Sequence, residues 1–267
     1  MKQKVLILGE SGFIGNHLKS MLNLAYEVID FNRKAQTLHE VLSENLPDIV
    51  INCSASKASA TIMESYEANI KFQMECIQVL LNLKAPTIKW IQVASYFELQ
   101  IPMGRNDNYT LDKQICRSIL HRIEATHLIQ LTTIYLPHVF GKGEDANRLI
   151  PTLTNKLQNG ELAEISQGEQ FLPILGIEDC CSAIVAAIST NQLVCSAAPI
   201  WYDRVKLLAK IMEKTISKGE VRMNIAKKSL DNAFPRVDFP PHVKNWNPSL
   251  TFDDFISELE NLNYMID

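Results

Sequence analysis

The sequence predicts an α/β fold in which a doubly wound parallel sheet carries a small C-terminal lobe. A short apolar run ends at a glycine-rich turn, a segment with helical periodicity follows this turn, and apolar strands then alternate with helices. Such alternation is typical of a parallel sheet with helices on both faces. The expected strands are 5–8, 28–31, 48–52, 88–93 and 128–135, and the expected helices are 13–24, 61–83 and 109–124.

Composition excludes several classes of protein. Hydrophobic residues make up 46% of the 267 residues and charged residues 21%, as in packed globular proteins. The net charge of −4 gives no basic field for nucleic acid, and no run of about 20 apolar residues could span a membrane. Six cysteines lack the spacing of a metal site, so we expect reduced core thiols, no bound metal and a cytoplasmic location.

The regular alternation stops near Gly141, and this change predicts the domain organisation. Residues 1–141 are expected to form the dinucleotide-binding domain, to which residues 170–190 return. Residues 142–267 are expected to form most of a substrate-binding lobe. Helices are predicted at 148–157 and 178–188, and a proline-rich tail follows.

The glycine-rich turn has the sequence G-x-x-G-x-x-G between a strand and a helix. In a Rossmann fold the first glycine allows a tight turn, the second lets the backbone approach a pyrophosphate, and the third lets helix and strand pack closely. The N–H groups at the helix start then face the anion. A turn without a ligand is the alternative. The predicted cofactor contacts here are Gly9, Ser11, Gly12, Phe13, Ile14 and Gly15.

The end of the second strand bears on the choice of cofactor. An acidic residue at this strand tip bonds the ribose hydroxyls of NAD, whereas an arginine accommodates the 2′-phosphate of NADP. Asp30 is expected inside the strand, with Asn32, Arg33 and Lys34 just beyond it. The sequence therefore favours NADP(H) over NAD(H), with Asn32 and Arg33 as contacts; a solvated pair of loop charges is the alternative.

Three residues are candidates for proton and hydride chemistry. Tyr109 and Lys113 are four positions apart, so on a helix they share a face. Ser95 lies at the end of the strand that precedes this helix. A carbonyl that receives a hydride must also receive a proton, which a tyrosine beside an ammonium can supply. Ser95 is then expected to orient the substrate oxygen; its alternative role is to cap the strand end.

Together, the segment KVLILGESGFIGNHLKSML (residues 4–22), Ser95 and the motif from Tyr109 to Lys113 resemble the short-chain dehydrogenase/reductase superfamily. The resemblance is to its extended branch, the NAD-dependent epimerase/dehydratase family of nucleotide-sugar enzymes. It implies a Ser-Tyr-Lys triad in which Lys113 also holds the nicotinamide ribose. It further implies cofactor contacts at Cys53, Ser54, Ala55, Asn69 and His138, and substrate contacts at Tyr96, His138, Arg148 and Arg236.

Departures from the family pattern narrow the expected reaction. The family's sugar dehydratases carry an acidic residue two positions after the catalytic hydroxyl, and Phe97 stands there. Only 14 positions separate Ser95 from Tyr109, and Tyr135 replaces the family's usual arginine in the fifth-strand segment. The short loop is most similar to reductases of nucleotide-linked 4-keto-6-deoxyhexoses, such as CDP-abequose synthase.

The expected function is therefore NADP(H)-dependent reduction of a nucleotide-linked 4-keto-6-deoxy sugar for O-antigen or other surface polysaccharides. An NAD-dependent nucleotide-sugar epimerase and a non-catalytic NADP-binding regulator are the alternatives. The expected partner is the nucleotide-sugar substrate. The helices at 61–83 and 109–124 could also pair two copies in a homodimer, although their apolar faces would suit the sheet alone.

Overall fold

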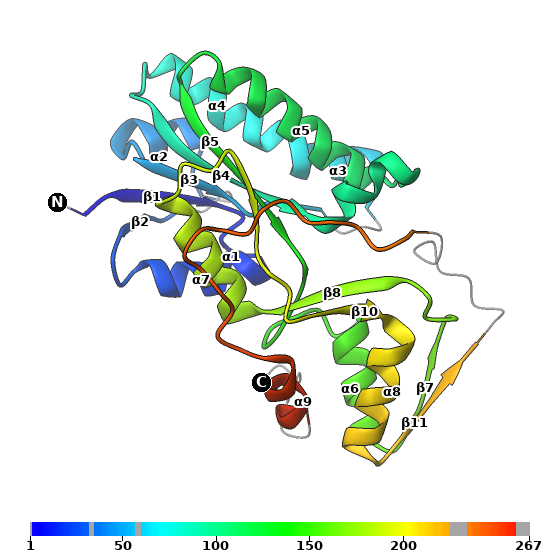
Figure 1. The fold of residues 1–267 in the computed structure, drawn as a ribbon. Coiled ribbons are helices and arrows are strands. Elements are labelled where there is room, and N and C mark those ends of the chain that lie inside the picture. Colours follow the sequence, from blue (N-terminus) through cyan, green and yellow to red (C-terminus); the bar gives the residue numbers. More distant parts are fainter. Residues whose placement is uncertain (1, 32–34, 57–59, 225–233, 260–267) are drawn as a thin grey trace. The chain divides into compact units, whose positions relative to one another are not determined.

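The computed structural model describes residues 2–31, 35–56, 60–224 and 234–259, and the chain divides into two compact units (Figure 1). Residues 170–179 belong to the second unit, so the return to the first begins at Cys180 rather than at residue 170. Unit 1 comprises Met1–Leu136, Cys180–Ala197 and Phe239–Trp246, and unit 2 comprises Pro137–Asp179, Ala198–Asp238 and Asn247–Asp267.

A six-stranded parallel sheet forms the centre of unit 1, with the strand order β2-β1-β3-β4-β5-β9. After β2 the chain crosses to the other side of β1, as in doubly wound folds, and the predicted Rossmann-type class is confirmed. The strands are β1 (Lys4–Leu8), β2 (Glu27–Ile29), β3 (Ile49–Asn52), β4 (Ile88–Ser95), β5 (Ile129–Leu136) and β9 (Val194–Ser196).

Helices cover both faces of this sheet (Figure 1). On one face α2, α4 and α5 pack against the strands around Trp90, which is fully buried. On the other face α1 lies beside α7, where the Cys181 thiol is 3.9 Å from the carbonyl oxygen of Ile14. The helices are α1 (Phe13–Leu22), α2 (Leu38–Glu44), α3 (Ile62–Tyr66), α4 (Phe72–Asn82), α5 (Asn108–Glu124) and α7 (Ile177–Ile188).

Local sequence explains where several helices begin. Thr37 and Thr61 each accept a hydrogen bond from the backbone N–H three residues on, and a glutamate at that position bonds back. This reciprocal capping box satisfies N–H groups that have no partner within the helix. The long helix expected at 61–83 is continuous but contains a π-helical turn, η1 (Glu67–Lys71), between α3 and α4.

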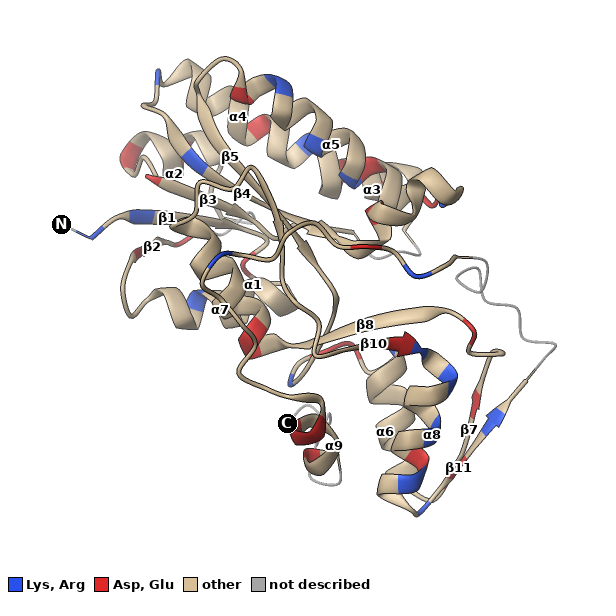
Figure 2. Cartoon of the chain, viewed as in Figure 1, with Lys and Arg blue, Asp and Glu red and all other residues tan. Residues whose placement is uncertain are grey.

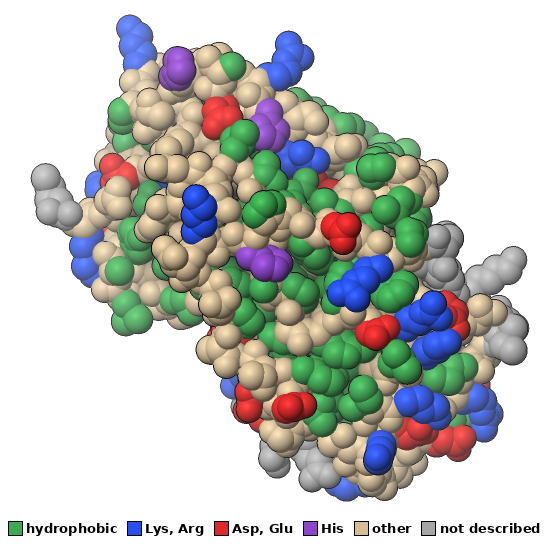
Figure 3. Space-filling view, in the orientation of Figure 1, with side chains coloured by type: hydrophobic (Ala, Val, Ile, Leu, Met, Phe, Trp, Pro, Cys, Tyr) green, Lys and Arg blue, Asp and Glu red, His purple; other side chains and the backbone are tan. Residues whose placement is uncertain are grey.

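Unit 2 contains a three-stranded sheet of order β10-β8-β6 and a two-stranded sheet of order β11-β7. Lys and Arg side chains gather with acidic ones over α8 (Figure 3). Glu169 pairs with Arg204 and Lys206 at 2.5 Å, and Lys210 pairs with Glu213 at 2.7 Å. The elements are β6 (His138–Phe140), α6 (Leu149–Gln158), β7 (Leu162–Ile165), β8 (Phe171–Gly176), β10 (Trp201–Arg204), α8 (Val205–Ile216), β11 (Glu220–Met223) and α9 (Phe252–Glu258).

Charged residues lie mainly on helices and loops, and the strands of the six-stranded sheet are mostly uncharged (Figure 2). This distribution follows from burial on both faces, which favours continuous apolar runs such as Val5–Leu8. Within the described part of the chain, every helix is too short or too polar to cross a bilayer.

Candidate functional site

The glycine turn connects β1 to α1 at the point where the sheet order reverses. Gly9 has φ +87°, and a Cβ there would lie 2.7 Å from the Ser54 nitrogen. A Cβ on Gly15 would lie 2.2 Å from the Gly9 carbonyl oxygen. No side chain fits either position without movement of the backbone. The turn is therefore pressed against both its own helix and the loop after β3, next to the crevice where doubly wound sheets bind ligands.

The N-terminus of α1 lacks a protein cap. Its N-cap residue is Gly12, the described residues supply no side-chain cap, and the first turn carries no acidic residue. By contrast, side-chain oxygens cap α2 and α3. Unpaired N–H groups and the positive end of the helix dipole form a binding site for an anion. The turn therefore fits the pyrophosphate of a dinucleotide cofactor.

The tip of β2 differs from its prediction. The strand ends at Ile29, so Asp30 is the first residue after it, and the expectation that Asp30 lies inside the strand is wrong. Pairing of β2 with β1 extends only to Ile29. The Asp30 carboxylate is exposed and binds the Lys19 ammonium, which also lies 3.6 Å from Glu10. The hydrogen bond that Lys19 donates to Asp30 raises the pKa of Lys19. Asn32 and Arg33 lie outside the described residues.

The loop after β3 lies against the glycine turn and near Lys113 of α5. Cys53 donates its N–H to the Leu8 carbonyl at 2.9 Å, and Ser54 lies against Gly9. Burial raises the pKa of the Cys53 thiol to about 12, the nearby Cys181 adds to this rise, and the Lys113 ammonium opposes it. Lys113 is thus close enough to Cys53 to act on it electrostatically. Ala55 is exposed at the start of the loop.

Asn69 is placed to hold this loop. Its amide donates to the hydroxyls of Ser56 and Ser65 at 2.9 and 3.0 Å, and its oxygen accepts from the Ser56 N–H at 3.3 Å. The residue is 2% exposed. Instead of presenting its amide to a ligand, Asn69 therefore fixes the backbone that follows Cys53 and Ser54.

Tyr109 and Lys113 lie on one face of α5, as their spacing predicts. The Lys113 ammonium is 5.7 Å from the centre of the Tyr109 ring. Lys113 is 4% exposed, whereas Tyr109 is only partly buried. An ammonium near an aromatic ring is attracted to it. The pair thus places a cationic group beside a phenol on one face of α5.

Ser95 ends β4 and begins the 3-10 helix η2 (Tyr96–Met103). Its hydroxyl accepts a hydrogen bond from the Phe97 N–H at 3.3 Å, so the capping role is observed. This contact uses an acceptor lone pair and leaves the hydroxyl proton for donation. Helix α5 packs against both β4 and η2, which brings the Ser95 turn to the helix that carries Tyr109.

Sequence reasoning missed a buried ion pair beneath Ser95. The Glu98 carboxylate accepts from the Ser95 N–H at 2.9 Å and from Arg117 of α5 at 3.2 Å. Its side chain is 1% exposed. The pattern Ser-x-x-Glu from Ser95 to Glu98 is a capping box, and this signal could have identified Glu98. Arg117 also lies 5.6 Å from the Tyr135 ring, and burial raises the pKa of Tyr135 to about 12.

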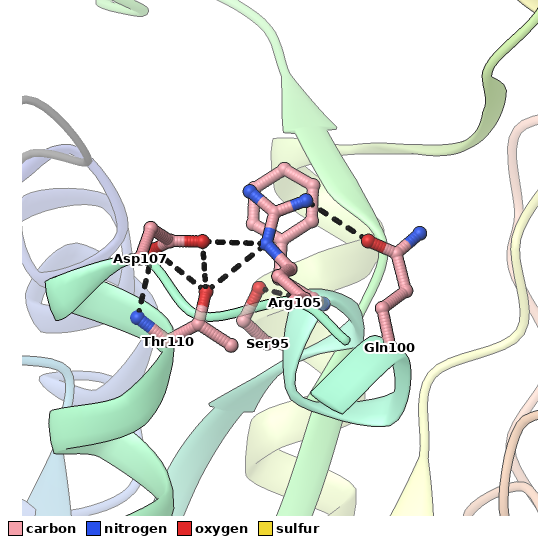
Figure 4. A network of polar contacts seen from close by, with 6 residues as sticks. Ser95, Gln100, Arg105, Asp107 and Thr110 are labelled. Carbon is pink, nitrogen blue, oxygen red and sulfur yellow. Dashed lines mark hydrogen bonds and ion pairs between the residues drawn. The ribbon is translucent and has the colours of Figure 1, made fainter. Parts of the chain in front are cut away.

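A second polar network joins η2 to the start of α5 (Figure 4). Arg105 bonds to Gln100, Asp107 and Thr110 and stacks on the ring of Phe97. No motif in the sequence marks Arg105. The N-cap aspartate Asp107, three residues before Thr110, is the only local signal in this segment.

Unit 2 contains the predicted substrate residues His138 and Arg148. They meet at Glu144, which is 1% exposed: His138 Nε2 and Arg148 Nε lie 3.2 and 3.3 Å from its Oε1. Arg148 donates to His138 Nδ1 at 3.0 Å, so the neutral ring carries its proton on Nε2. Burial and the Arg148 charge lower the pKa of His138, although Glu144 opposes them.

Two further predicted substrate residues differ in exposure. Arg236 of unit 2 is exposed, and its guanidinium lies 4.5 Å from the centre of the Tyr202 ring. Tyr96 of unit 1 is 4% exposed, and its ring packs on Phe97 at 4.3 Å between centroids. Arg236 is accessible to an anionic ligand, whereas Tyr96 presents little surface to a substrate.

Comparison with known proteins agrees with this geometry. Residues 5–194 match the model of the NAD dependent epimerase/dehydratase family. CDP-abequose synthase of Yersinia pseudotuberculosis is 22% identical over 214 residues, which cover 71% of this chain and 74% of the relative. The resemblance drawn from the sequence is thereby confirmed.

Two solved structures share the fold. The UDP-glucose 4-epimerase of Thermotoga maritima, solved with UDP-glucose, has a TM-score of 0.80 and 17% identity over 97% of both chains. RMD of Pseudomonas aeruginosa, complexed with NADPH, has a TM-score of 0.78 and 16% identity over 98% of both chains. At these identities the likeness establishes the architecture alone.

Proposed function

The chain belongs to the NAD dependent epimerase/dehydratase family and is an NAD(P)-dependent enzyme of the extended short-chain dehydrogenase/reductase type, and on this premise we propose that it reduces a nucleotide-linked 4-keto-6-deoxy sugar. The observation that carries the proposal is the pair on α5: a buried Lys113 ammonium lies 5.7 Å from the ring of Tyr109. The resemblance to CDP-abequose synthase supports the choice of substrate class.

In the proposed reaction each residue has one role. The nicotinamide cofactor, when bound, supplies the hydride. Tyr109 donates its phenolic proton to the carbonyl oxygen, and the Lys113 charge stabilises the phenolate that remains. Ser95 donates its hydroxyl proton in a hydrogen bond to the same oxygen and fixes its direction. Within unit 2 we propose His138, Arg148 and Arg236 as residues that recognise a sugar diphosphate, since their cationic or polar groups suit it.

The surroundings of Ser95 support reduction over dehydration. Removal of water from a sugar needs an acid or base in addition to the tyrosine. Phe97 supplies an apolar ring that Arg105 covers at 3.6 Å. The nearby Glu98 carboxylate is committed to the Ser95 N–H and to Arg117. This segment therefore offers no carboxylate to a substrate.

For the cofactor we propose a preference for NADP(H), carried by Arg33 and Asn32. A carboxylate at the strand tip ordinarily repels a 2′-phosphate. The Lys19 ammonium bound to Asp30 offsets that negative charge. This neutralisation makes a phosphate beside Asp30 acceptable. The glycine turn supplies the pyrophosphate site for either cofactor.

The decisive experiment follows NADPH and NADH consumption with a panel of CDP-, dTDP- and GDP-linked 4-keto-6-deoxyhexoses. We expect one sugar to drive stoichiometric oxidation, with a higher kcat/KM for NADPH. If no sugar is reduced although the protein binds a cofactor, the reductase proposal fails. Binding without any turnover would then favour a non-catalytic regulator.

A second candidate is a nucleotide-sugar epimerase that uses NAD. It is favoured by one observation, the position of Asp30 directly after β2, where an acidic residue can bond ribose hydroxyls. An epimerase oxidises and re-reduces its sugar and consumes no cofactor overall. Tightly bound NAD released on denaturation, together with interconversion of UDP-sugars without added cofactor, would replace the reductase proposal.

A further inference from the structure

The segment between Ser95 and Tyr109 is short and is shaped by one left-handed residue. Helix η2 is followed by its C-cap residue Gly104, which has φ +99°, a backbone conformation that residues with a Cβ rarely adopt. Gly104 donates its N–H to the Ile101 carbonyl at 2.9 Å. The chain turns back here, so Arg105 immediately follows the turn and lies between η2 and the first turn of α5.

Arg105 contacts both elements at once (Figure 4). Toward η2, it donates to the Gln100 side-chain oxygen at 2.9 Å, and its guanidinium lies 3.6 Å from the centre of the Phe97 ring. Toward α5, its Nε lies 2.7 Å from Asp107 Oδ2 and 3.2 Å from Thr110 Oγ1. The side chain is only 9% exposed, which reduces screening of these contacts by water.

The contacts on the α5 side fix the residues on either side of Tyr109. Asp107 is the N-cap, and its carboxylate accepts from the Thr110 N–H at 2.9 Å and the Thr110 hydroxyl at 2.8 Å. Capping alone needs no more than this, as Thr61 shows at the start of α3. The hydrogen bond from Arg105 to Gln100 and its ring contact with Phe97 are not part of the cap. They tie the capped turn to η2, and hence to the Ser95 end of β4.

The Glu98–Arg117 pair makes a second connection between the same elements. Arg117 lies eight residues beyond Tyr109 on α5, and Glu98 binds the Ser95 backbone. The Ser95 turn is therefore held against α5 at two points, one at the beginning of the helix and one farther along it. Tyr109 and Lys113 lie between these points in the sequence of α5.

We propose that Arg105 is a positioning residue of the candidate active site, where it fixes the Tyr109 phenol relative to the Ser95 hydroxyl. The inference rests on the proposed function of Tyr109 and Ser95 in proton donation. A displacement of about 1 Å in such a site costs about a hundredfold in rate, so a rigid connection matters for turnover. A planar guanidinium can stack on a ring while its edge donates hydrogen bonds, whereas a lysine ammonium has no flat face for stacking.

The test compares Arg105→Gln and Arg105→Lys with the control Arg122→Gln, which alters an exposed arginine in the last turn of α5. The first readout needs no substrate. All seven tyrosines are replaced by 3-fluorotyrosine, and the ¹⁹F signal of Tyr109 is assigned by its loss in Tyr109→Phe. We expect this signal to shift in both Arg105 variants and to stay unchanged in the control.

The second readout is steady-state kinetics with the sugar that the panel identifies. We expect kcat to fall about tenfold to a hundredfold in Arg105→Gln, with the KM for the sugar and the Kd for NADPH unchanged. In a Tyr109→Phe background the Arg105→Gln change should cost no further rate, since it acts through the phenol. A separate, additive loss in that background would overturn the proposal.

The two proposals fail in different ways. If no sugar is turned over by the unaltered protein, the reductase function fails, and the Tyr109 signal alone decides the role of Arg105. If Arg105→Gln and Arg105→Lys lower only the melting temperature, and the Tyr109 signal and kcat stay unchanged, Arg105 is merely structural and the inference is overturned. Arg105→Lys carries the test should Arg105→Gln fail to fold.

Discussion

The two halves of the candidate site in unit 1 are built in different ways. The glycine turn is a backbone site, in which Gly9, Gly12 and Gly15 shape the chain and the N-terminus of α1 is the proposed pyrophosphate site. The proposed catalytic half is a side-chain site, in which the Glu98–Arg117 ion pair joins η2 to α5 and Arg105 pairs with the N-cap residue Asp107. In the second half, therefore, the positions of the proposed catalytic residues depend more on residues that have no proposed contact with the ligand.

The largest expected effect tests the catalytic half alone. Tyr109→Phe removes one oxygen and retains the ring, so turnover of the identified sugar should fall by about 10²–10⁴-fold, the usual contribution of a general acid. Cofactor binding, measured by fluorescence titration, should stay unchanged because the glycine turn is separate. Normal turnover in this variant would refute the assigned role of Tyr109.

The next effect distinguishes two roles of glycine in the turn: close backbone packing at Gly15 and room for the proposed cofactor at Gly12. In Gly15→Ala the new Cβ meets the Gly9 oxygen at 2.2 Å and the Glu10 Cα at 2.7 Å. The backbone must move, so we expect a loss of about 1–3 kcal/mol in the free energy of unfolding, together with weaker cofactor binding. In Gly12→Ala the nearest protein atom is 3.2 Å away.

Gly12→Ala should therefore weaken cofactor binding and change the unfolding midpoint in urea much less than Gly15→Ala does. Both quantities are measured for both variants. If Gly12→Ala leaves cofactor affinity intact, the backbone at the N-terminus of α1 is not the pyrophosphate site, and the comparison between the two halves breaks.

A smaller effect concerns Asp30, the acidic residue that directly follows β2. Asp30→Asn removes a negative charge beside the proposed site of the 2′-phosphate. Unit charges 4 Å apart in water interact by about 1 kcal/mol, so the ratio of NADPH to NADH affinity should rise about fivefold. Glu27→Gln at the start of β2 is the control. An unchanged ratio in Asp30→Asn would place the ribose away from this residue.

The smallest expected effect is on the pH dependence of stability, and it arises from His138, a buried polar group in unit 2. Its pKa is lowered from 6.5 in the folded chain, so below pH 6.5 the unfolded imidazole binds a proton that the folded one does not. Stability should thus decline as the pH falls from 6.5 toward the folded pKa, by at most about 1.4 kcal/mol per pH unit.

Urea midpoints between pH 7 and pH 5 check this expectation. His138→Gln should show a shallower decline than the unaltered chain, whereas His39→Gln, at an exposed position, should not. Equal slopes in all three proteins would show that His138 is protonated as readily in the folded state as in the unfolded one.

Sequence patterns predicted the features that arise from neighbouring residues. The alternation of apolar strands and helices gave the parallel sheet, and the four-residue spacing placed Lys113 beside Tyr109. The prediction for Asp30 was wrong because apolar residues flank it at Ile29 and Phe31, whereas pairing with β1 stops at Ile29. β1 itself continues to Leu8, so β2 ends because its chain leaves β1 after Ile29, and the pattern of a single strand does not contain that information.

The sequence by itself determined the glycine turn, the helix starts at Thr37 and Thr61, and the shared face of Tyr109 and Lys113, because each depends on contacts within about one turn of backbone. Only the tertiary structure decided that β9 joins β5, that Glu98 meets Arg117, and that Arg105 links Phe97 to Asp107. These pairings depend on which elements pack together. A charged side chain gains its role only when folding buries it beside a partner.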